Sequence, residues 1–332
     1  MAVKYVYADC AASCPPLSCA VDVFTKWKYA NPNSVHSLGR DARGDLEWAR
    51  EAIAFYINAK PEQIAFTPSA TAACHYAMDR LKVISMSRFE HKAVASYIGR
   101  CRNENGVAHM LANNETGERF DSTVKLLAES AAPVFTDATA AVGQIPVDVQ
   151  KLGVAALAAG GHKFGALPGI GFVYIRSGVT DDDTFPGTPP VALAVAMANA
   201  LSYRIQHMIE SNVYLIEQTD RLAKAILDIP GAHINTPMDK RVPNILSVRF
   251  DGVNARELLS MLDVNGVYAS AGAACTADAD EPSRVLLASG LTEEQALETI
   301  RLSFCPETKP EEFNFVADAL IRCVAQLRRL TK

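Results

Sequence analysis

The chain has 332 residues, of which 49% are hydrophobic and 21% charged, and its formal net charge is −5. This composition is ordinary for a globular protein, and the length allows a large domain with a smaller one. The acidic balance offers no basic field for nucleic acid, and no apolar stretch reaches the ~18 residues that span a bilayer. No apolar leader segment begins the chain, so we expect a cytoplasmic protein that binds neither nucleic acid nor membrane.

Short apolar or β-branched runs alternate with helical-looking stretches through the first two thirds of the chain. The runs predict strands at 64–67, 83–87, 107–112, 132–136, 155–158 and 171–175. The helical periodicity predicts helices over 40–58, 71–82, 190–210 and 213–228. This alternation predicts an α/β fold with a mainly parallel central sheet and helices on both faces.

The last third changes character. Residues 245–250 alternate like a half-buried strand, residues 255–265 are helical, and Pro310 begins a further helix. We therefore expect a domain boundary near 205–215 and a smaller α+β domain after it. The expected parts are an arm over 1–15 that packs on the small domain, a large domain over 16–210 and a small domain over 211–332.

Eight cysteines occur without an export signal, which favours reduced thiols over a disulfide framework. Cys10, Cys14 and Cys19 form a C-x3-C-x4-C run, but this spacing fits no standard zinc pattern. We interpret these cysteines as small residues packed in the N-terminal arm and expect no metal site.

Gly161-His162-Lys163 follows the strand predicted at 155–158. A lysine on such a loop can form a Schiff base with the aldehyde of pyridoxal 5'-phosphate. The alternative is a solvated surface lysine. The glycines that follow do not form G-x-G-x-x-G, which argues against a dinucleotide site.

Two further features suit the same cofactor. Asp137 follows the strand predicted at 132–136, where a carboxylate can keep a pyridine nitrogen protonated; otherwise it is a cap or turn residue. Ala70 and Thr71 open a predicted helix, whose free N–H groups and dipole suit a phosphate. An ordinary helix cap explains the second feature equally well.

His91 and Asn114 also follow predicted strands. His91 could stack on the cofactor ring and move protons near neutral pH, although a lone histidine is more often structural. Asn114 could reach the ring oxygen, and a tight turn is the alternative for Asn-Asn-Glu-Thr-Gly.

Cys275 ends the small-residue run Ser-Ala-Gly-Ala-Ala-Cys, which suits a thiol that enters a site and delivers sulfur outward. The nearby Asp278, Asp280 and Glu281 disfavour its thiolate, and a buried inert cysteine is the alternative. Arg301 could bind a substrate carboxylate in bidentate fashion; without context it reads as a surface arginine.

The order of these motifs resembles that of the NifS/IscS-like cysteine desulfurases of the class V aminotransferase family, over nearly the whole chain. The matching stretches are Tyr7-x-Asp9-x-Ala11-Ala12, Asn31-Pro32-Asn33-Ser34-x-His36, Ala70-Thr71, Glu90-His91-Lys92-Ala93-Val94, Asn113-Asn114-Glu115-Thr116-Gly117, Asp137-Ala138-Thr139, Gly161-His162-Lys163 and Ser270-x-Gly272-x-Ala274-Cys275. The resemblance implies a fold type I homodimer that converts L-cysteine to L-alanine and an enzyme persulfide. It also implies an acceptor protein, a scaffold or carrier, in iron–sulfur cluster assembly or thiolation.

The resemblance also implies roles for individual residues. Lys163 would carry the cofactor and move protons, Asp137 would pair with the pyridinium, and His91 would stack on the ring. Cys275 would take the sulfur. The remaining implied contacts are His162 and Thr188 for the cofactor, and Asn33 and Arg301 for the substrate.

Several positions depart from the family pattern. Ala140 replaces a glutamine that contacts the phenolic oxygen, Gly160 replaces a phosphate-binding serine, and Ala72 replaces a glutamate. The segment 183–188 is short and lacks the usual arginine, although Thr188 remains. Losing two or three hydrogen bonds of about 0.5–1.5 kcal/mol each weakens cofactor binding by about one to three decades.

Two alternatives stand beside the desulfurase. A selenocysteine lyase or another class V β-lyase is a second enzyme reading, against which Cys275 argues because such chemistry can proceed without a cysteine acceptor. A degenerate homologue that acts as a binding subunit is the third. The departures motivate it, and the retained Lys163, Asp137 and His91 argue against it.

Overall fold

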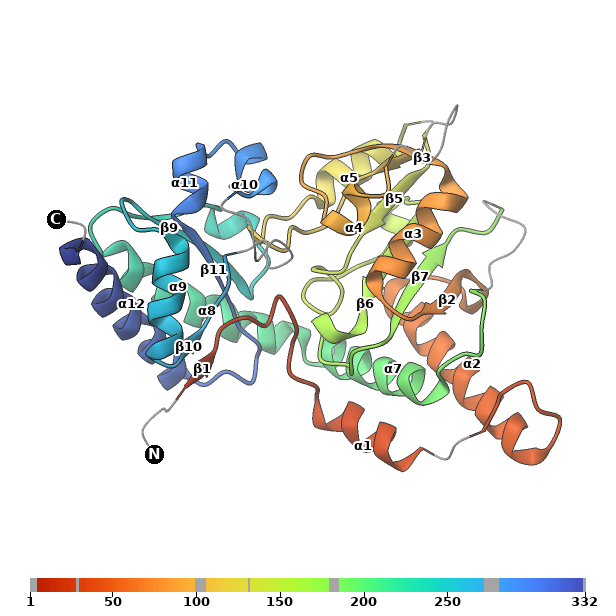
Figure 1. Cartoon of the computed structure of the whole chain (residues 1–332). Helices are drawn as coiled ribbons and strands as arrows, with labels where there is room; N and C mark the ends of the chain where they lie inside the picture. The colour runs from red at the N-terminus through yellow and green to blue at the C-terminus, as the bar shows by residue number, and fades with distance from the viewer. Residues whose placement is uncertain are drawn as a thin grey trace. The chain divides into compact units, whose positions relative to one another are not determined.

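The computed structural model of the chain describes residues 5–27, 30–98, 106–130, 132–178, 185–271 and 281–330. The chain forms two compact units. The large unit comprises Ser13–Ala112 and Phe120–Met208, and the small unit comprises Met1–Ala12, Asn113–Arg119 and Ile209–Lys332. Figure 1 shows the elements of both units.

A six-stranded sheet organises the large unit. Its order is β2 (Ile64–Thr67), β7 (Gly171–Ile175), β6 (Ala156–Gly160), β5 (Val134–Asp137), β4 (Gly106–Ala108) and β3 (Val83–Met86). Strands β3 to β6 run parallel, while β7 is antiparallel to both of its neighbours. Every residue of β5, β6 and β7 is buried, as is usual for central strands covered on both faces.

Helices of the large unit cover the sheet and one another (Figure 1). They are α1 (Ser18–Lys26), α2 (Ser37–Ile57), α3 (Ala70–Leu81), α4 (Lys92–Ala95), α5 (Asp121–Ala128), α6 (Val149–Leu152) and α7 (Val191–Gln206). Helix α3 packs on β6 and β7, and α7 packs against both α1 and α2. Helix α7 is rich in alanine, and these small side chains allow the close approach.

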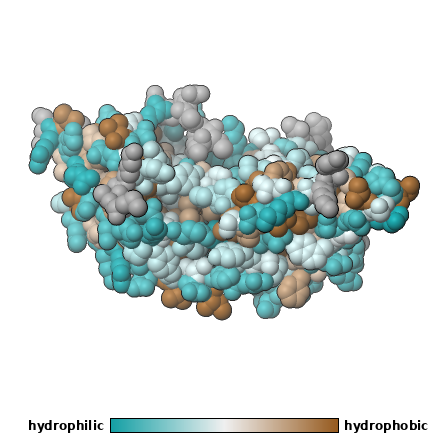
Figure 2. Space-filling model, turned by 90° about the horizontal axis from the view of Figure 1, so that it is seen from below, coloured by the Kyte–Doolittle hydropathy of each residue, from teal (hydrophilic) through white to brown (hydrophobic). Residues whose placement is uncertain are grey.

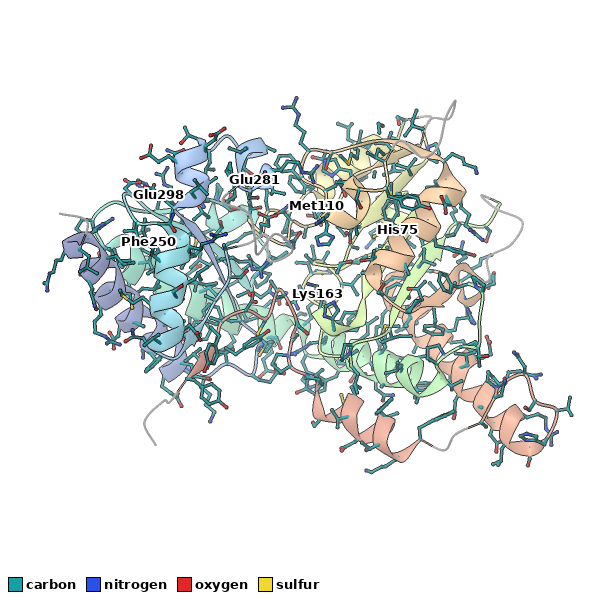
Figure 3. The ribbon with its side chains drawn as sticks, viewed as in Figure 1. His75, Met110, Lys163, Phe250, Glu281 and Glu298 are labelled. Carbon is teal, nitrogen blue, oxygen red and sulfur yellow. The ribbon has the colours of Figure 1, made fainter. Side chains whose placement is uncertain are left out.

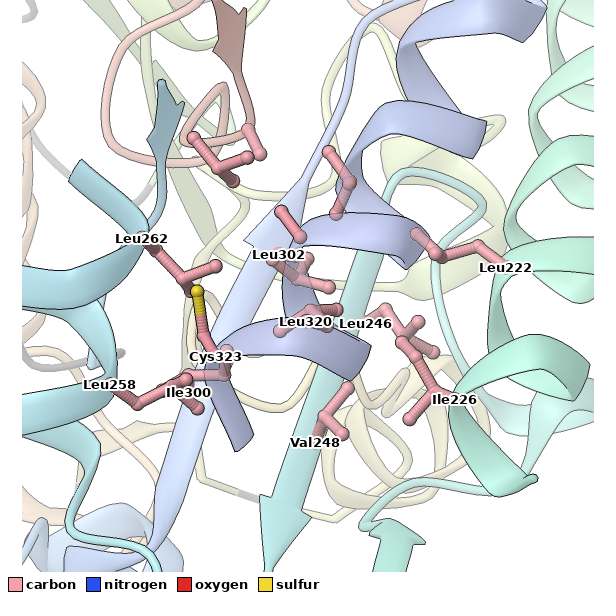
Figure 4. Close-up of a cluster of buried hydrophobic side chains, with 14 of the residues drawn as sticks. Leu222, Ile226, Leu246, Val248, Leu258, Leu262, Ile300, Leu302, Leu320 and Cys323 are labelled. Atoms are coloured by element: carbon pink, nitrogen blue, oxygen red, sulfur yellow. The ribbon is translucent and has the colours of Figure 1, made fainter. Parts of the chain in front are cut away.

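The small unit has an antiparallel sheet in the order β11 (Thr299–Ser303), β9 (Ile245–Phe250) and β8 (Ala232–Ile234). A separate parallel pair joins β1 (Val6–Tyr7) to β10 (Val267–Tyr268). The other elements are α8 (Met208–Leu227), α9 (Ala255–Val264), α10 (Arg284–Ala288), α11 (Glu293–Leu297) and α12 (Pro310–Leu330). Figure 4 shows the core, in which apolar side chains of α8, α9 and α12 meet those of β9 and β11.

The predicted α/β fold with a mainly parallel central sheet is confirmed. The predicted strand at 107–112 ends early, at Ala108, although the amides of His109 and Leu111 still donate to the β5 carbonyls of Phe135 and Asp137. The helix predicted over 190–210 ends earlier, at Gln206, and the helix predicted over 213–228 begins earlier, at Met208. Among the described residues, none of the helices combines the length and apolar character that crossing a membrane requires.

Candidate active site

Lys163 and Asp137 follow the ends of neighbouring parallel strands. Asp137 is the last residue of β5, and Lys163 closes the short 3-10 turn Gly161–Lys163 directly after β6. Strands β5 and β6 pair in register, with Asp137 opposite Ala158. The carboxyl ends of parallel strands meet at one edge of a sheet, where ligands of such folds bind. Figure 3 labels Lys163 beyond the end of β6.

The Asp137 carboxylate is buried, with 5% of the residue exposed. Its Oδ1 accepts the Thr139 amide at 2.9 Å. On α3, burial and the Asp137 and Glu90 carboxylates raise the pKa of the Cys74 thiol well above its usual value, and this thiol is hydrogen-bonded to Asp137. Cys74 therefore stays protonated and supports the carboxylate of Asp137. No local sequence pattern identifies Cys74, because its role depends on how α3 packs.

His162 is a neutral ring at the working pH of most enzymes. Burial, together with the neighbouring charge of Lys163, lowers the pKa of His162 to about 4. Its Nδ1 lies 3.3 Å from the Ser13 hydroxyl, which fixes the orientation of the imidazole. Ser13 is a residue that the sequence patterns did not identify.

The loop after β6 is held by donors from other segments of the large unit. Two backbone amides donate to this loop: Cys14 to the carbonyl of residue 162 at 2.9 Å, and Leu17 to that of residue 165 at 2.8 Å. Two side chains donate between them: Gln144 Nε2 to the carbonyl of residue 163 at 3.5 Å, and Arg204 Nε to that of residue 164 at 3.1 Å. Four consecutive peptides are therefore anchored, and Lys163 stands on a fixed backbone.

The start of α3 packs closely on β6 and β7. Ser69 caps α3 by accepting the Ala72 amide at 3.2 Å, and Ala70 and Thr71 form the first helical positions. A Cβ on Gly160 would lie 3.0 Å from the Cβ of Ala70. The small residues at 160 and 70 therefore pack together, at the position where the family has its serine.

His91 is half-buried and caps α4 (Lys92–Ala95), with its Nδ1 accepting the Ala93 amide at 3.1 Å. This bond fixes the tautomer of His91, because an accepting Nδ1 places the ring proton on Nε2 in the neutral form. The nearby His75, labelled in Figure 3, stacks on Tyr97 with a 4.1 Å centroid distance and contacts the Ala93 carbonyl, so its role is structural.

Asn33 and Thr188 are exposed positions of the large unit. Asn33 lies in a turn, where its amide donates to the Asn31 side chain at 2.9 Å. Thr188 precedes α7. Ala140, which replaces the family's glutamine, is half-buried just after β5.

Asn114 and Arg301 belong to the small unit. Arg301 lies within β11 and is 2% exposed, so the surface-arginine reading is wrong. One of its terminal nitrogens, Nη2, pairs with Asp9 Oδ1 at 2.5 Å, and the other donates to the Asn114 carbonyl at 2.8 Å. Asp9, which the sequence offered only as part of a motif, thus holds the predicted substrate arginine.

Glu115 is a further buried acid beside Arg301. Burial raises the pKa of Glu115, while a hydrogen bond from Ser283 and the charges of Arg301 and Arg284 partly offset this. The Ser283 hydroxyl donates to Glu115 at 2.5 Å. Ser283 also caps α10 (Arg284–Ala288), so Glu115 fixes the beginning of that helix.

Cys275 lies outside the described residues, as do Asp278, Asp280, Asp183 and Thr184. The residue nearest before Cys275 with described hydrogen bonds is Ser270, which exchanges two backbone bonds with Arg301.

The cysteine run of the N-terminus divides between the units. Cys10 belongs to the small unit, while Cys14 and Cys19 belong to the large unit. Cys14 is buried and its sulfur accepts from Arg204 Nη2 at 3.5 Å. Within the described ranges, no group of three or more potential ligand side chains gathers as a metal site.

The residues of the large unit fit pyridoxal phosphate. The buried Asp137 carboxylate suits a protonated ring nitrogen, and Lys163 provides the amine at the same sheet edge. In the described part of the chain, the buried hydroxyl of Thr139 has no hydrogen-bond partner, so a polar ligand group beside Asp137 would satisfy it. The first turn of α3 offers backbone amides to a phosphate.

The aminotransferase class-V family model matches residues 6–107, 79–183 and 181–316. The chain belongs to this family. Pyridoxal phosphate, the cofactor of the family, is therefore its cofactor.

Curated relatives cover the chain almost completely. The chain is 31% identical to the cysteine desulfurase IscS of Dictyoglomus turgidum, over 99% of this chain and 96% of that protein. It is 29% identical to the IscS-like cysteine desulfurase of Mycobacterium tuberculosis, over 97% of each. The solved structure of a NifS-like protein superposes with a TM-score of 0.87 at 25% identity, covering 98% of this chain and 100% of that one.

Proposed function

We propose that the protein is a cysteine desulfurase, which releases L-alanine from L-cysteine and retains the sulfur as a persulfide. The observation that carries this proposal is the placement of Lys163 and Asp137 after neighbouring parallel strands, in a chain whose relatives are named cysteine desulfurases. The lysine and the acid are the two groups that this chemistry requires of the large unit.

The candidate site residues of the large unit each have a role in this proposal. When bound, pyridoxal phosphate supplies an aldehyde for the amine and a ring that accepts electrons from the substrate carbon. Lys163 holds the cofactor and moves the proton at its Nζ. Asp137, which is buried and receives the Thr139 amide, would pair with the ring nitrogen and keep it protonated. His91 stacks on the ring, and the neutral His162 adds no positive charge beside Lys163.

The first turn of α3, with Ala70 and Thr71, would hold the phosphate, and Thr188 would add a hydroxyl to the phosphate bound in the partner subunit. Asn114 binds the ring oxygen. Arg301 and Asn33 bind the carboxylate of the substrate, and Asp9 keeps the guanidinium of Arg301 oriented until the substrate arrives.

Cys275 takes the sulfur. Its thiolate attacks the substrate sulfur, the carbon–sulfur bond breaks, and the electron pair of that bond remains with the alanine skeleton, which gains a proton. The resulting persulfide passes to an acceptor protein, a scaffold or carrier, for iron–sulfur clusters or thiolated products. We place the enzyme in the cytoplasm.

We further infer a homodimer. Large apolar side chains are exposed on the helices α1 and α2 of the large unit, namely Val21, Phe24, Leu38, Trp48 and Phe55. Figure 2 shows apolar patches among hydrophilic residues on one face of the molecule. Apolar surface of this kind supports a second copy of the chain as the partner.

The test is alanine release from L-cysteine by the cofactor-loaded protein in the presence of a thiol reductant. The parent should give alanine and sulfide in equal amounts, and Cys275→Ala should lose both. Cys19→Ala, which removes a half-buried thiol that donates to the Asn199 carbonyl, is the matched control and should retain both. Alanine release by Cys275→Ala at the rate of the parent would sink the proposal.

A further inference from the structure

Arg204 is a buried cation that the proposed chemistry does not use. It lies on α7 (Val191–Gln206) and is 3% exposed. Its Nε donates to the Phe164 carbonyl at 3.1 Å, one peptide beyond Lys163, and its Nη2 donates to the Cys14 sulfur at 3.5 Å. One guanidinium therefore joins α7, the loop of Lys163 and the segment that begins at Ser13.

Burying an arginine is energetically unfavourable compared with burying an apolar side chain. Taking a guanidinium out of water costs several kcal/mol, and apolar residues of similar volume often replace buried ions without loss of stability. The presence of a buried arginine at position 204 is therefore explained better by the direction of its bonds than by packing alone.

The backbone on which Arg204 acts has little freedom to move. Gly165 has a φ of +92°, and a Cβ there would lie 2.8 Å from the Leu17 Cγ and 3.4 Å from Arg204 Nη2. Gly143 has a φ of +78°, and a Cβ added at this position would lie 2.6 Å from the Cβ of Phe164. Neighbouring segments thus enclose residues 164 and 165 closely, and Arg204 supplies the hydrogen bond to the Phe164 carbonyl.

The other side-chain donor to this loop is weaker. Gln144 Nε2 reaches the Lys163 carbonyl at 3.5 Å, the long end of a hydrogen bond, and it is a neutral amide. A bond from a charged donor is stronger than one from a neutral donor. Among the side chains that contact the loop carbonyls in the described structure, Arg204 is therefore the main anchor.

We propose that Arg204 is a positioning residue for Lys163: it fixes the peptide after the lysine and so sets the direction from which the lysine amine meets the cofactor. The proposal rests on the proposed role of Lys163 as the cofactor-bearing lysine. It adds a residue of α7 to the machinery, with no contact to substrate.

The test compares Arg204→Leu and Arg204→Lys with the matched control Arg241→Leu. Arg241 is also a buried arginine, 5% exposed, and it donates to the carbonyls of Val242 and Pro243 in the small unit. Arg241 also donates to the Thr219 hydroxyl at 2.8 Å and pairs with Asp220 at 3.0 Å. The same substitution thus removes a larger described set of bonds, far from Lys163 in sequence. Arg204→Lys keeps the charge and serves if Arg204→Leu does not fold.

Two readouts report on Lys163 without any turnover of L-cysteine. The first is hydrogen exchange of the amides of residues 161–166 in the cofactor-free protein, and the second is the pH at which the visible cofactor band titrates. Borohydride reduction followed by mass spectrometry shows that the cofactor is joined to Lys163 in each variant. Because no readout needs desulfurase activity, a failure of the proposed function remains distinguishable from a failure of this proposal.

In the Arg204 variants we expect the amides of 161–166 to exchange about ten- to a hundredfold faster, as for the loss of one charge-assisted hydrogen bond. We expect the band to titrate at a pH shifted by about one unit, a tenfold change in the proton equilibrium. Arg241→Leu should change neither. Unchanged exchange and an unchanged titration in a folded Arg204 variant, or equal changes in Arg241→Leu, would overturn the proposal.

Discussion

Replacing Gly171 with alanine probes how tightly the start of α3 is locked to the sheet. Gly171 begins β7, and a Cβ added there would lie 2.7 Å from the Ala159 carbonyl oxygen and 2.9 Å from the Ser69 carbonyl carbon. These atoms belong to the backbone of β6 and of the α3 cap, so no side chain can turn aside to make room. The added methyl must separate α3 from the sheet.

The magnitude follows from this geometry. Overpacking a closely packed interior costs about 1–3 kcal/mol. For a unit of this size, each 1 kcal/mol shifts the unfolding midpoint by about 2–4 °C, so Gly171→Ala should lower it by about 2–12 °C. If the first turn of α3 moves by enough to lose one charge-assisted bond to the phosphate, cofactor affinity should fall about ten- to a hundredfold.

Gly44→Ala is the matched control, since it makes the same chemical change within α2. A Cβ at Gly44 meets nothing within 4 Å. Alanine is favoured over glycine inside a helix by up to about 1 kcal/mol, so Gly44→Ala should raise the midpoint slightly and leave cofactor affinity unchanged.

The assay is thermal unfolding of the cofactor-free protein, followed by equilibrium titration with pyridoxal phosphate. The unfolding midpoint should fall in Gly171→Ala and rise in Gly44→Ala. A Gly171→Ala protein as stable as the parent, with the affinity of the parent, would show that β7 and α3 are not in the close contact described here.

Two further predictions concern titration and the buried ion pair. His162 has a pKa of about 4 in the folded protein and about 6.5 when unfolded, so the unfolded state binds more protons between these values and stability falls as the pH drops from 6.5 to 4. His162→Gln should reduce that loss of stability by about 1–3 kcal/mol, a range that allows for partial solvent screening. Urea unfolding of both proteins at pH 4.5 and 7.5 measures the difference. The same pH dependence of stability in the parent and the variant would refute the prediction. Asp9→Asn should destabilise the protein by about 3–5 kcal/mol, because the buried Arg301 loses the Asp9 carboxylate. The control is Asp251→Asn, at a half-exposed pair with His233, which should destabilise the protein by less than about 1 kcal/mol. Equal costs in urea unfolding would contradict this account.

Much of the large unit could be predicted from short-range patterns. Five of the six strands predicted in the large unit match the observed ones within about two residues. Four of the five are fully buried and read as short apolar runs, whereas β3 is partly exposed. Lys163 and Asp137 were identifiable for the same reason, since each follows such a run. Helix α1 (Ser18–Lys26) was not singled out, and its first turn lacks a side-chain cap that would have marked its start.

The supporting contacts of the site could not be predicted in this way. Ser13 and His162 are 149 residues apart, Cys14 and Arg204 are 190 apart, and Asp9 and Arg301 are 292 apart. No local periodicity carries information over such separations. Arg301 shows the consequence: its residue type suggested a role, but only the fold shows that it is buried and paired.

The three-segment make-up of the small unit has a practical consequence for anyone who wishes to study it alone. A protein that begins at residue 209 would contain α8 except its first residue, all of the antiparallel sheet and α12, yet it would lack β1, the strand that pairs with β10. It would also lack Asp9 and the segment 113–119, and with them the Asp9 carboxylate and the Asn114 backbone carbonyl that accept from the guanidinium of Arg301. The small unit is thus assembled from three segments that are far apart in the sequence, and no single continuous segment of the chain contains all of it.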